Sequence, residues 1–349
     1  MALRTSIRDI MLKKFFNGIL ALFATSTVAA QSEPIKVLFV GNSYTHMNNM
    51  PKMFDKIATD AGMDVIVEKC AQSGASFQVH SQRPELYEAI KKRKWDYVIL
   101  QGYSRELTFE PNHIDTATVP FINKLTDSIY QNNACTNVLF YMTWGYEEGF
   151  LEREETDTYL KMATRIEEGY RYLGDRYNLP VVPVGMVWKQ VKMEKCLDLY
   201  APDRAHPSKT GSYLIASTFF ESIFGVEQEK GVGIVKERHA GKVREAVHTV
   251  VAEKREYYKL DRAHIKLDTE NDDDKLIVNY DISFPEAKSI TWTFEEGKTR
   301  EGNAGTYEFA KRENYKIRVD VVTACGDTRT YYRQVNFISP KRRRRKERD

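Results

Sequence analysis

The chain has 349 residues, which suggests two domains of ordinary size. Its 42% hydrophobic and 29% charged residues are ordinary for a globular protein, and 17 Phe, 20 Tyr and 4 Trp exclude a wholly disordered chain. The net charge of +3 comes from the ends, because residues 1–30 carry +3 and residues 341–349 carry +5, which leaves −5 for residues 31–340. An acidic body argues against a nucleic-acid-binding protein, which would need a basic face on the fold itself.

The amino terminus has the pattern of a secretory signal. Lys13 and Lys14 precede an apolar stretch, Phe15–Val28, and small residues follow up to Ala30. This pattern predicts a signal peptide over residues 1–30, cleaved near Ala30, and hence a secreted or periplasmic protein. The alternative is a buried first helix. The apolar stretch is short for a bilayer-spanning helix, and no transmembrane segment is expected.

The cysteines do not form a recognisable framework. Cys70, Cys135, Cys196 and Cys325 are too few for a disulfide scaffold and have no metal-binding spacing. Export makes one disulfide possible, but the spacing does not choose the pair.

Up to residue 225, short apolar runs alternate with amphipathic stretches. This alternation is typical of βαβ units, in which helices cover both faces of a parallel sheet. Ligands of such sheets bind beyond the carboxyl ends of the strands. In chain order, we expect strands at residues 35–40, 65–67, 96–101, 137–143 and 180–184, and helices at residues 51–61, 85–94, 114–131, 156–177 and 208–224.

The pattern changes after Gly225. One more helix is expected at residues 242–258, and from Leu276 onward apolar residues alternate at period two. Five short strands with turns between them predict a small β-sandwich of the Ig-like kind. The run Asn271–Asp274 is interpreted as the linker to it, since the spacing of a calcium-binding loop is absent. The expected domains are residues 31–265 and 266–340, followed by a basic tail at residues 341–349.

Two short motifs carry chemistry at the predicted carboxyl edge of the sheet. Gly41-Asn42-Ser43-Tyr44 follows the first strand, which exposes a serine hydroxyl, although such a motif alone is more often just a turn. Asp203-Arg204-Ala205-His206 precedes the last helix of the sheet region, and an Asp at this spacing can orient the imidazole as a general base. A serine hydroxyl needs such a base to become nucleophilic. Together the motifs predict a Ser-His-Asp triad.

These motifs resemble the blocks of the SGNH (GDSL-like) hydrolase superfamily, in particular its secreted bacterial branch with a Gly-Asn-Ser-Tyr/Phe-Thr first block. The resemblance runs from about Ile35 to Phe224 and includes Ser73-Gly74-Ala75 as the second block. It implies a flavodoxin-like three-layer α/β sandwich with a parallel sheet, and an esterase, thioesterase, lipase or carbohydrate deacetylase without metal or other cofactor. By position, it implies that Ser43 is the nucleophile, His206 the general base and Asp203 its orienter.

The resemblance also implies an oxyanion hole, in which the family uses the N–H of the nucleophile, a Gly N–H and an Asn side chain. Ser43 and Gly74 match the first two donors. The family's Gly-x-Asn-Asp is missing, because the chain has Leu100-Gln101-Gly102-Tyr103-Ser104 after the third strand. Gln101 is the nearest amide donor and is the expected substitute; the loss of one donor costs about 3 kcal/mol.

Three further residues near this edge are candidate substrate contacts: His46, Trp144 and Tyr146. Aromatic rings after the fourth strand could stack on a sugar, whose faces are partly apolar, but they could equally pack in the core. His46 could equally be a helix-start residue without a catalytic task.

The sequence therefore predicts a secreted serine esterase that hydrolyses small esters through an acyl-enzyme on Ser43. O-acetyl groups on carbohydrate are the expected substrate, on the grounds of export, aromatic richness and an appended β-module. The alternative is a non-catalytic or weakly active SGNH-fold protein that binds glycans, which the altered third block favours. The acyl group, the alcohol, the ligand of the β-module and the oligomeric state stay open.

Overall fold

The computed structural model describes residues 33–336, apart from residues 196, 262–263, 273–274, 285–286, 312, 325 and 327. The predicted signal peptide at residues 1–30 and the basic tail at residues 341–349 lie outside the described residues. The described residues from Pro34 onward belong to one compact unit with two hydrophobic cores, one up to Leu260 and one from Leu276 onward. Within these ranges, no helix combines the length and the apolar character of a transmembrane segment.

The first core surrounds a five-stranded parallel sheet with the strand order β2-β1-β3-β4-β5. Its central strands are covered on both faces, since every residue of Val37–Gly41 and Val98–Leu100 is buried. Apolar side chains on both faces are what a sheet between two helical layers requires. The predicted parallel sheet is confirmed. Its strands are β1 (Ile35–Gly41), β2 (Val65–Ala71), β3 (Tyr97–Leu100), β4 (Asn137–Tyr141) and β5 (Val181–Val182).

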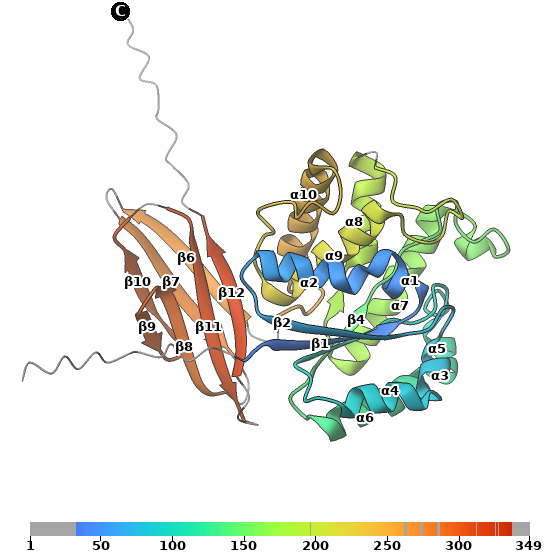
Figure 1. Ribbon diagram of the computed structural model, residues 1–349, viewed down its shortest axis with the longest axis horizontal. Coiled ribbons are helices and arrows are strands. Elements are labelled where there is room, and N and C mark those ends of the chain that lie inside the picture. Colours follow the sequence, from blue (N-terminus) through green and yellow to red (C-terminus); the bar gives the residue numbers. More distant parts are fainter. Residues whose placement is uncertain are drawn as a thin grey trace, which may run out of the picture. The chain divides into compact units, whose positions relative to one another are not determined.

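Helices cover both faces of this sheet, with α2, α8, α9 and α10 on one side and α3, α4, α5 and α6 on the other (Figure 1). The central helix is α9, in which every residue of Gly211–Phe224 is buried. Its Phe219 meets Phe39 of β1 edge to face, with ring centroids 5.1 Å apart. The helices are α1 (Ser43–His46), α2 (Met50–Asp60), α3 (Phe77–Ser81), α4 (Pro84–Lys91), α5 (Pro111–Ala117), α6 (Val119–Asn132), α7 (Tyr159–Tyr177), α8 (Val184–Gln190), α9 (Lys209–Phe224) and α10 (Glu237–Lys254).

The helix expected at residues 114–131 is in fact two helices, α5 and α6, which meet at Thr118. Pro120 stands in the first turn of α6. Proline has no N–H to continue a helix that precedes it, but it fits a first turn well. The break follows from this preference.

The second core lies within two antiparallel sheets, with the strand orders β10-β7-β6 and β12-β11-β8-β9. β7 buries alternate side chains from Leu276 to Ile282, as the period-two pattern predicts. Aromatic rings fill the space, and Tyr307 stacks on Phe294 with centroids 4.1 Å apart. The expected C-terminal β-strands are confirmed. They are β6 (His264–Asp272), β7 (Lys275–Ser283), β8 (Ala287–Glu295), β9 (Lys298–Glu301), β10 (Ala304–Phe309), β11 (Tyr315–Thr323) and β12 (Thr328–Val335).

The interpretation of Asn271–Asp274 as a linker is wrong. β6 already begins at His264, and Asp272 pairs with Lys275 at the end of a β6–β7 hairpin. A polar hairpin turn and a polar linker have the same composition, so the sequence does not separate them.

Two of the four cysteines lie among the described residues with a defined state. Cys70 is free and buried, whereas Cys135 is disulfide-bonded. Cys196 and Cys325 lie outside the described residues.

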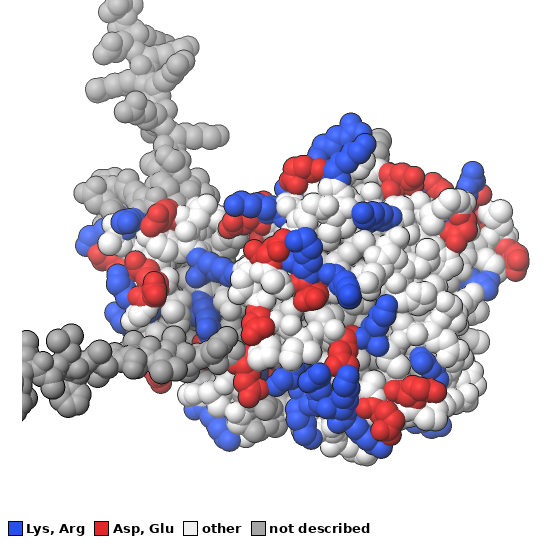
Figure 2. Space-filling model, in the orientation of Figure 1, with Lys and Arg blue, Asp and Glu red and all other residues white. Residues whose placement is uncertain are grey.

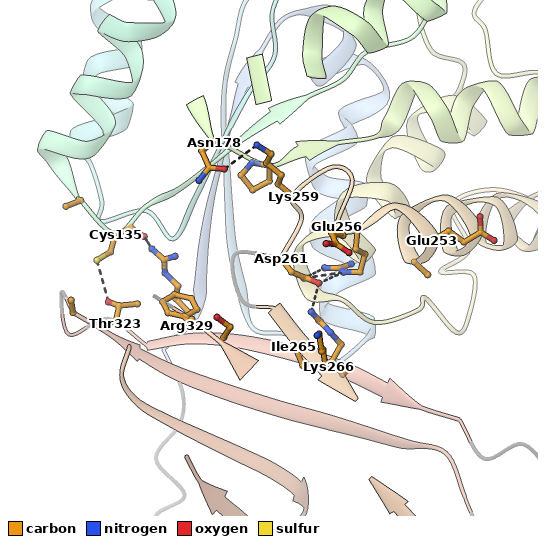
Figure 3. A pocket seen from close by; sticks show the side chains of 18 residues that line it. Cys135, Asn178, Glu253, Glu256, Lys259, Asp261, Ile265, Lys266, Thr323 and Arg329 are labelled. Atoms are coloured by element: carbon orange, nitrogen blue, oxygen red, sulfur yellow. Dashed lines mark hydrogen bonds and ion pairs between the residues drawn. The ribbon is translucent and has the colours of Figure 1, made fainter. Parts of the chain in front are cut away.

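An ion pair joins β12 to the segment after α10, and a hydrogen bond joins it to the amino-terminal edge of the parallel sheet. Asp261 lies between the guanidinium groups of Arg255 and Arg333, with an N–O distance of 2.7 Å to each. Arg329 donates to the carbonyl oxygen of Cys135, just before β4. Figure 3 shows these contacts beside a cavity of about 1100 Å³, lined by residues up to Asp261 and by residues from Ile265 onward. This cavity lies at the edge opposite to the carboxyl ends of the strands.

Lysine and arginine side chains are interspersed with aspartate and glutamate over the face drawn in Figure 2. This mixture agrees with the small negative net charge of residues 31–340. A surface that binds the phosphate backbone of a nucleic acid instead carries mainly positive charge.

Candidate active site

The chain turns sharply from β1 into α1 at Asn42, whose side-chain oxygen caps the helix by accepting the N–H of Tyr44 at 3.0 Å. Gly41 leaves no room for a side chain, because a Cβ there would overlap Thr45 Oγ1 and Gln101 Oε1. Ser43 therefore becomes the first residue of α1, at the carboxyl end of β1. Its backbone N–H is among those that a helix start leaves without an internal acceptor.

The structure brings Ser43 together with His206 and Asp203, which follow it in the sequence by 160 residues or more. Ser43 Oγ lies 2.8 Å from His206 Nε2, and His206 Nδ1 lies 2.6 Å from Asp203 Oδ2. The Asp203 carboxylate accepts Nδ1–H, so the imidazole presents its other nitrogen to the serine hydroxyl as an acceptor. This arrangement of hydroxyl, imidazole and carboxylate can activate the serine as a nucleophile.

The Asp203 carboxylate is held in its ionised form. Partial desolvation acts to raise the pKa of Asp203, but hydrogen bonds from the backbone N–H groups of His206 and Ala205 and the contact with the imidazole lower it. Those N–H groups lie 2.9 and 3.0 Å from Oδ1. The side chains of Asp203 and His206 are 52% and 32% exposed, so both are open to solvent.

Of the two alternatives for Trp144, stacking on a sugar or packing in the core, the structure shows packing in the core. Its side chain is fully buried and stacks between Tyr44 and Trp188, with ring centroids 4.3 and 4.0 Å apart. Its indole N–H donates to the carbonyl oxygen of Ala205 at 3.1 Å. Trp144 therefore packs beneath the nucleophile turn and holds the loop that carries His206.

Gln101 differs from its expected place. The side chain is fully buried below the nucleophile turn and does not lie over the crevice. Its Oε1 accepts the backbone N–H of Asn42 and the hydroxyl of Thr45, both at 2.9 Å, and its Nε2 donates to the carbonyl oxygen of Gly102. Both the oxygen and the nitrogen of the amide bond to the protein, and the side chain has no exposed surface, so this amide is not aimed at a substrate oxyanion.

Asn42 joins the same set of loops from the other side. Its Nδ2 donates to the carbonyl oxygens of Ala75 and Gly102, each at 3.1 Å. We call Asn42 and Gln101 the amide clasp, because the two side chains tie together the loops after β1, β2 and β3. The sequence offers no signal for this clasp beyond the presence of two amides near strand ends.

Two backbone N–H groups are available as donors at this edge of the sheet. Within the described part of the chain, neither the N–H of Ser43 nor that of Gly74 has a hydrogen-bond acceptor. Gly74 lies beside the nucleophile turn, since Gln72 N–H donates to Gly41 at 3.0 Å. It has a φ of +71°, which favours glycine, and open space surrounds the position of a Cβ.

His46 ends α1 and Tyr146 lies on the loop after β4, and their proposed contacts with substrate stay predictions. His46 Nε2 is 2.9 Å from Ser73 Oγ at the surface. The Tyr146 hydroxyl is 2.7 Å from Ser104 Oγ, and its ring is half-buried.

Glu106 is a residue that the sequence analysis missed. Its carboxylate accepts the N–H of Phe77 at 3.1 Å and that of Tyr103 at 2.8 Å, which ties the start of α3 to the loop after β3. Burial raises the pKa of Glu106 to about 7, while these hydrogen bonds oppose the rise. An acidic residue shortly after a strand end is the signal that could have indicated it.

No family model and no curated protein sequence matches the chain. Among solved structures, it is similar to a DUF4886 family protein from Bacteroides uniformis, with 18% identity over 63% of this chain and 95% of that chain and a TM-score of 0.54. Weaker similarity is found to a lipase from a goat rumen metagenome (16% identity, 53% and 95% covered, TM-score 0.40) and an acetyl xylan esterase from Geobacillus stearothermophilus (16%, 54% and 93%, TM-score 0.39). The similarity to the DUF4886 family protein concerns the fold alone, which in this chain is a parallel five-stranded sheet covered by helices and followed by antiparallel β-sheets.

Proposed function

We propose that this protein is a serine esterase that hydrolyses small esters through an acyl-enzyme on Ser43. The observation that carries the proposal is the hydrogen-bonded chain from Ser43 Oγ through His206 to Asp203. Each member has the partner that its role requires, and the carboxylate is ionised by its environment. An Asp that orients a His, which in turn contacts a Ser, is the arrangement that acyl transfer uses.

The chemistry follows from this geometry. Ser43 Oγ attacks the ester carbonyl carbon while its proton passes to His206 Nε2, and Asp203 stabilises the imidazolium that forms. The N–H groups of Ser43 and Gly74 stabilise the negative charge on the carbonyl oxygen. The C–O bond then breaks, the alcohol takes the proton from Nε2, and water repeats the sequence to release the acid.

The substrate class is a further part of the proposal. An open site accepts an ester displayed on a large molecule, and the signal-like amino terminus points to export, so O-acetyl groups on carbohydrate fit best. The second candidate is a glycan-binding protein with little or no turnover. It is favoured by the amide clasp, since Gln101 does not replace the missing third oxyanion donor.

Hydrolysis of 4-nitrophenyl acetate, butyrate and octanoate by the purified protein tests the proposal. We expect the acetate to be the best substrate and Ser43→Ala to lower kcat by at least about 10³-fold without a change in the melting curve. Ser289→Ala, at an exposed position on β8, serves as the control and should be as active as the wild type. Activity of Ser43→Ala within threefold of the wild type would show that the triad does not act.

A further inference from the structure

An arginine without an acidic partner lies on the loop after β3, the strand next to β1 in the sheet. Arg105 donates to the Tyr103 hydroxyl at 3.2 Å, and its guanidinium lies 3.9 Å from the centroid of the Phe150 ring. Among the described residues, no carboxylate is within ion-pair distance of Arg105. Glu152 interacts with it only at longer range. The neighbouring Arg153, by contrast, pairs with Glu155 at 3.4 Å.

Arg105 belongs to the loop that lies beside the nucleophile turn. This loop starts at Gly102, whose carbonyl oxygen accepts from Asn42, the residue before Ser43. Further along the loop, Ser104 meets the Tyr146 hydroxyl at 2.7 Å. Burial raises the pKa of Tyr44, the residue after Ser43, and the Tyr146 phenol and Ser104 of this loop also act on it.

The environment of Arg105 prepares it to bind an anion. Its guanidinium stacks on one ring and is held at its edge by the Tyr103 hydroxyl, so little freedom is lost when a ligand binds. It keeps its charge at any relevant pH, and its planar fork matches the two oxygens of a carboxylate. A stacked arginine is also weakly hydrated, which lowers the cost of removing water from it.

We propose that Arg105 and Tyr103 form a subsite for a carboxylate of the substrate, so that the enzyme prefers esters that carry a negative charge. This inference rests on the proposed esterase function, because it names the substrate class of the same site. The carboxylate can stand on the alcohol, as in an acetylated uronic acid, or on the acyl group, as in a half-ester of a dicarboxylic acid.

Matched substrate pairs test the proposal. On the acyl side, 4-nitrophenyl acetate is compared with the mono-4-nitrophenyl ester of succinic acid. On the alcohol side, an O-acetylated methyl glucoside is compared with the corresponding glucuronide. The variants are Arg105→Met, which keeps the contact with Phe150 but removes the charge, and Arg105→Lys, which keeps the charge. Arg153→Met, at an arginine that also lies over a phenylalanine ring, is the control.

We expect Arg105→Met to lower kcat/KM about 10- to 100-fold for the anionic member of at least one pair, through KM, and to change the neutral member less than threefold. Arg105→Lys should recover part of the loss, and the preference of the wild type should weaken at high ionic strength. The pair that responds shows on which side the carboxylate binds. Equal effects of Arg105→Met on both members of both pairs would overturn the proposal.

A binding measurement keeps this inference separate from the esterase proposal. Calorimetry measures the affinity of the acetylated glucuronide and of the succinate half-ester for Ser43→Ala, with and without Arg105→Met. An affinity that falls at least tenfold supports the subsite even if the wild type hydrolyses no ester, in which case only the esterase proposal fails. An unchanged affinity for both ligands would overturn the subsite while leaving hydrolysis of neutral esters as evidence for the triad.

Discussion

Replacing Gln101 by alanine should destabilise the nucleophile turn rather than remove an oxyanion donor. The amide is fully buried and makes three hydrogen bonds, to Asn42 N–H, the Thr45 hydroxyl and the Gly102 carbonyl. Gln101→Ala leaves the Asn42 N–H and the Thr45 hydroxyl without a partner in a space that water does not reach, whereas the Gly102 carbonyl keeps the hydrogen bond from Asn42 Nδ2. Each unsatisfied buried polar group costs about 1–3 kcal/mol, so the free energy of unfolding should fall by roughly 2–6 kcal/mol. This loss is a large part of the free energy of unfolding of a typical protein, which is about 10 kcal/mol.

Gln101→Glu separates the two roles more sharply. When protonated, the new carboxyl can accept at one oxygen and donate from the other, as the amide does. Burial raises the pKa of a carboxyl group above its unfolded value. The folded state then binds more protons than the unfolded state, so stability is greatest at acid pH and falls as pH rises through the folded pKa.

Urea unfolding and steady-state hydrolysis at pH 5 and pH 8 measure these effects, with the exposed Gln131→Ala as a control. We expect Gln101→Ala to be destabilised at both pH values, and Gln101→Glu to approach the stability of the wild type at pH 5 only. Unchanged stability of Gln101→Ala, combined with a fall in kcat of about 10² to 10³ at constant KM, would refute the clasp and restore the role of an oxyanion donor.

Three further perturbations follow from single contacts. Asp261→Asn should lower the free energy of unfolding in urea at pH 7 by about 3–5 kcal/mol, because it leaves Arg255 and Arg333 buried without their anion; a loss below about 1 kcal/mol would contradict a structural ion pair. The raised pKa of Glu106 makes the wild type lose stability as pH rises from near 4.5, the pKa of this group in the unfolded state, to about 7, its pKa in the folded state. Glu106→Gln should remove this loss, and parallel curves of stability against pH for the two proteins over that range would contradict the prediction. Trp144→Phe keeps the ring stack but loses the N–H that holds the histidine loop, so kcat should fall about tenfold at similar KM, and an unchanged kcat would show that the loop needs no such support.

The proximity of Ser43, His206 and Asp203 could be predicted because the positions of these residues depend only on the topology of the sheet. Ser43 follows the first strand and His206 precedes a helix that packs on the same sheet, and the carboxyl ends of parallel strands meet at one edge. The direction of a side chain at a strand end is a finer property. Gln101 and Trp144 both follow strands, yet both are fully buried, because neighbouring loops offer them partners that no local pattern reveals.

Contacts between distant segments likewise could not be predicted from the sequence. Asp261 and Arg333 lie 72 positions apart, and only the folded chain shows that they share one buried site with Arg255. The polar run at Asn271–Asp274 misled for a related reason, since the pairing of Asp272 with Lys275 depends on the register of the whole hairpin. The sequence thus predicts which helices and strands form, whereas the contacts and directions of individual side chains depend on packing.

Whether Ser43 is an activated nucleophile is the central question, and labelling with a fluorophosphonate answers it directly. Ser43 Oγ would attack phosphorus and displace fluoride, with its proton passing to His206, so only an activated serine reacts. After digestion, mass spectrometry should find the phosphonate adduct on the peptide that contains Ser43. The adduct should be absent in Ser43→Ala and strongly reduced in His206→Ala, while Ser289→Ala is labelled like the wild type. No adduct on Ser43 in the folded wild-type protein, or equal labelling in His206→Ala, would contradict the account.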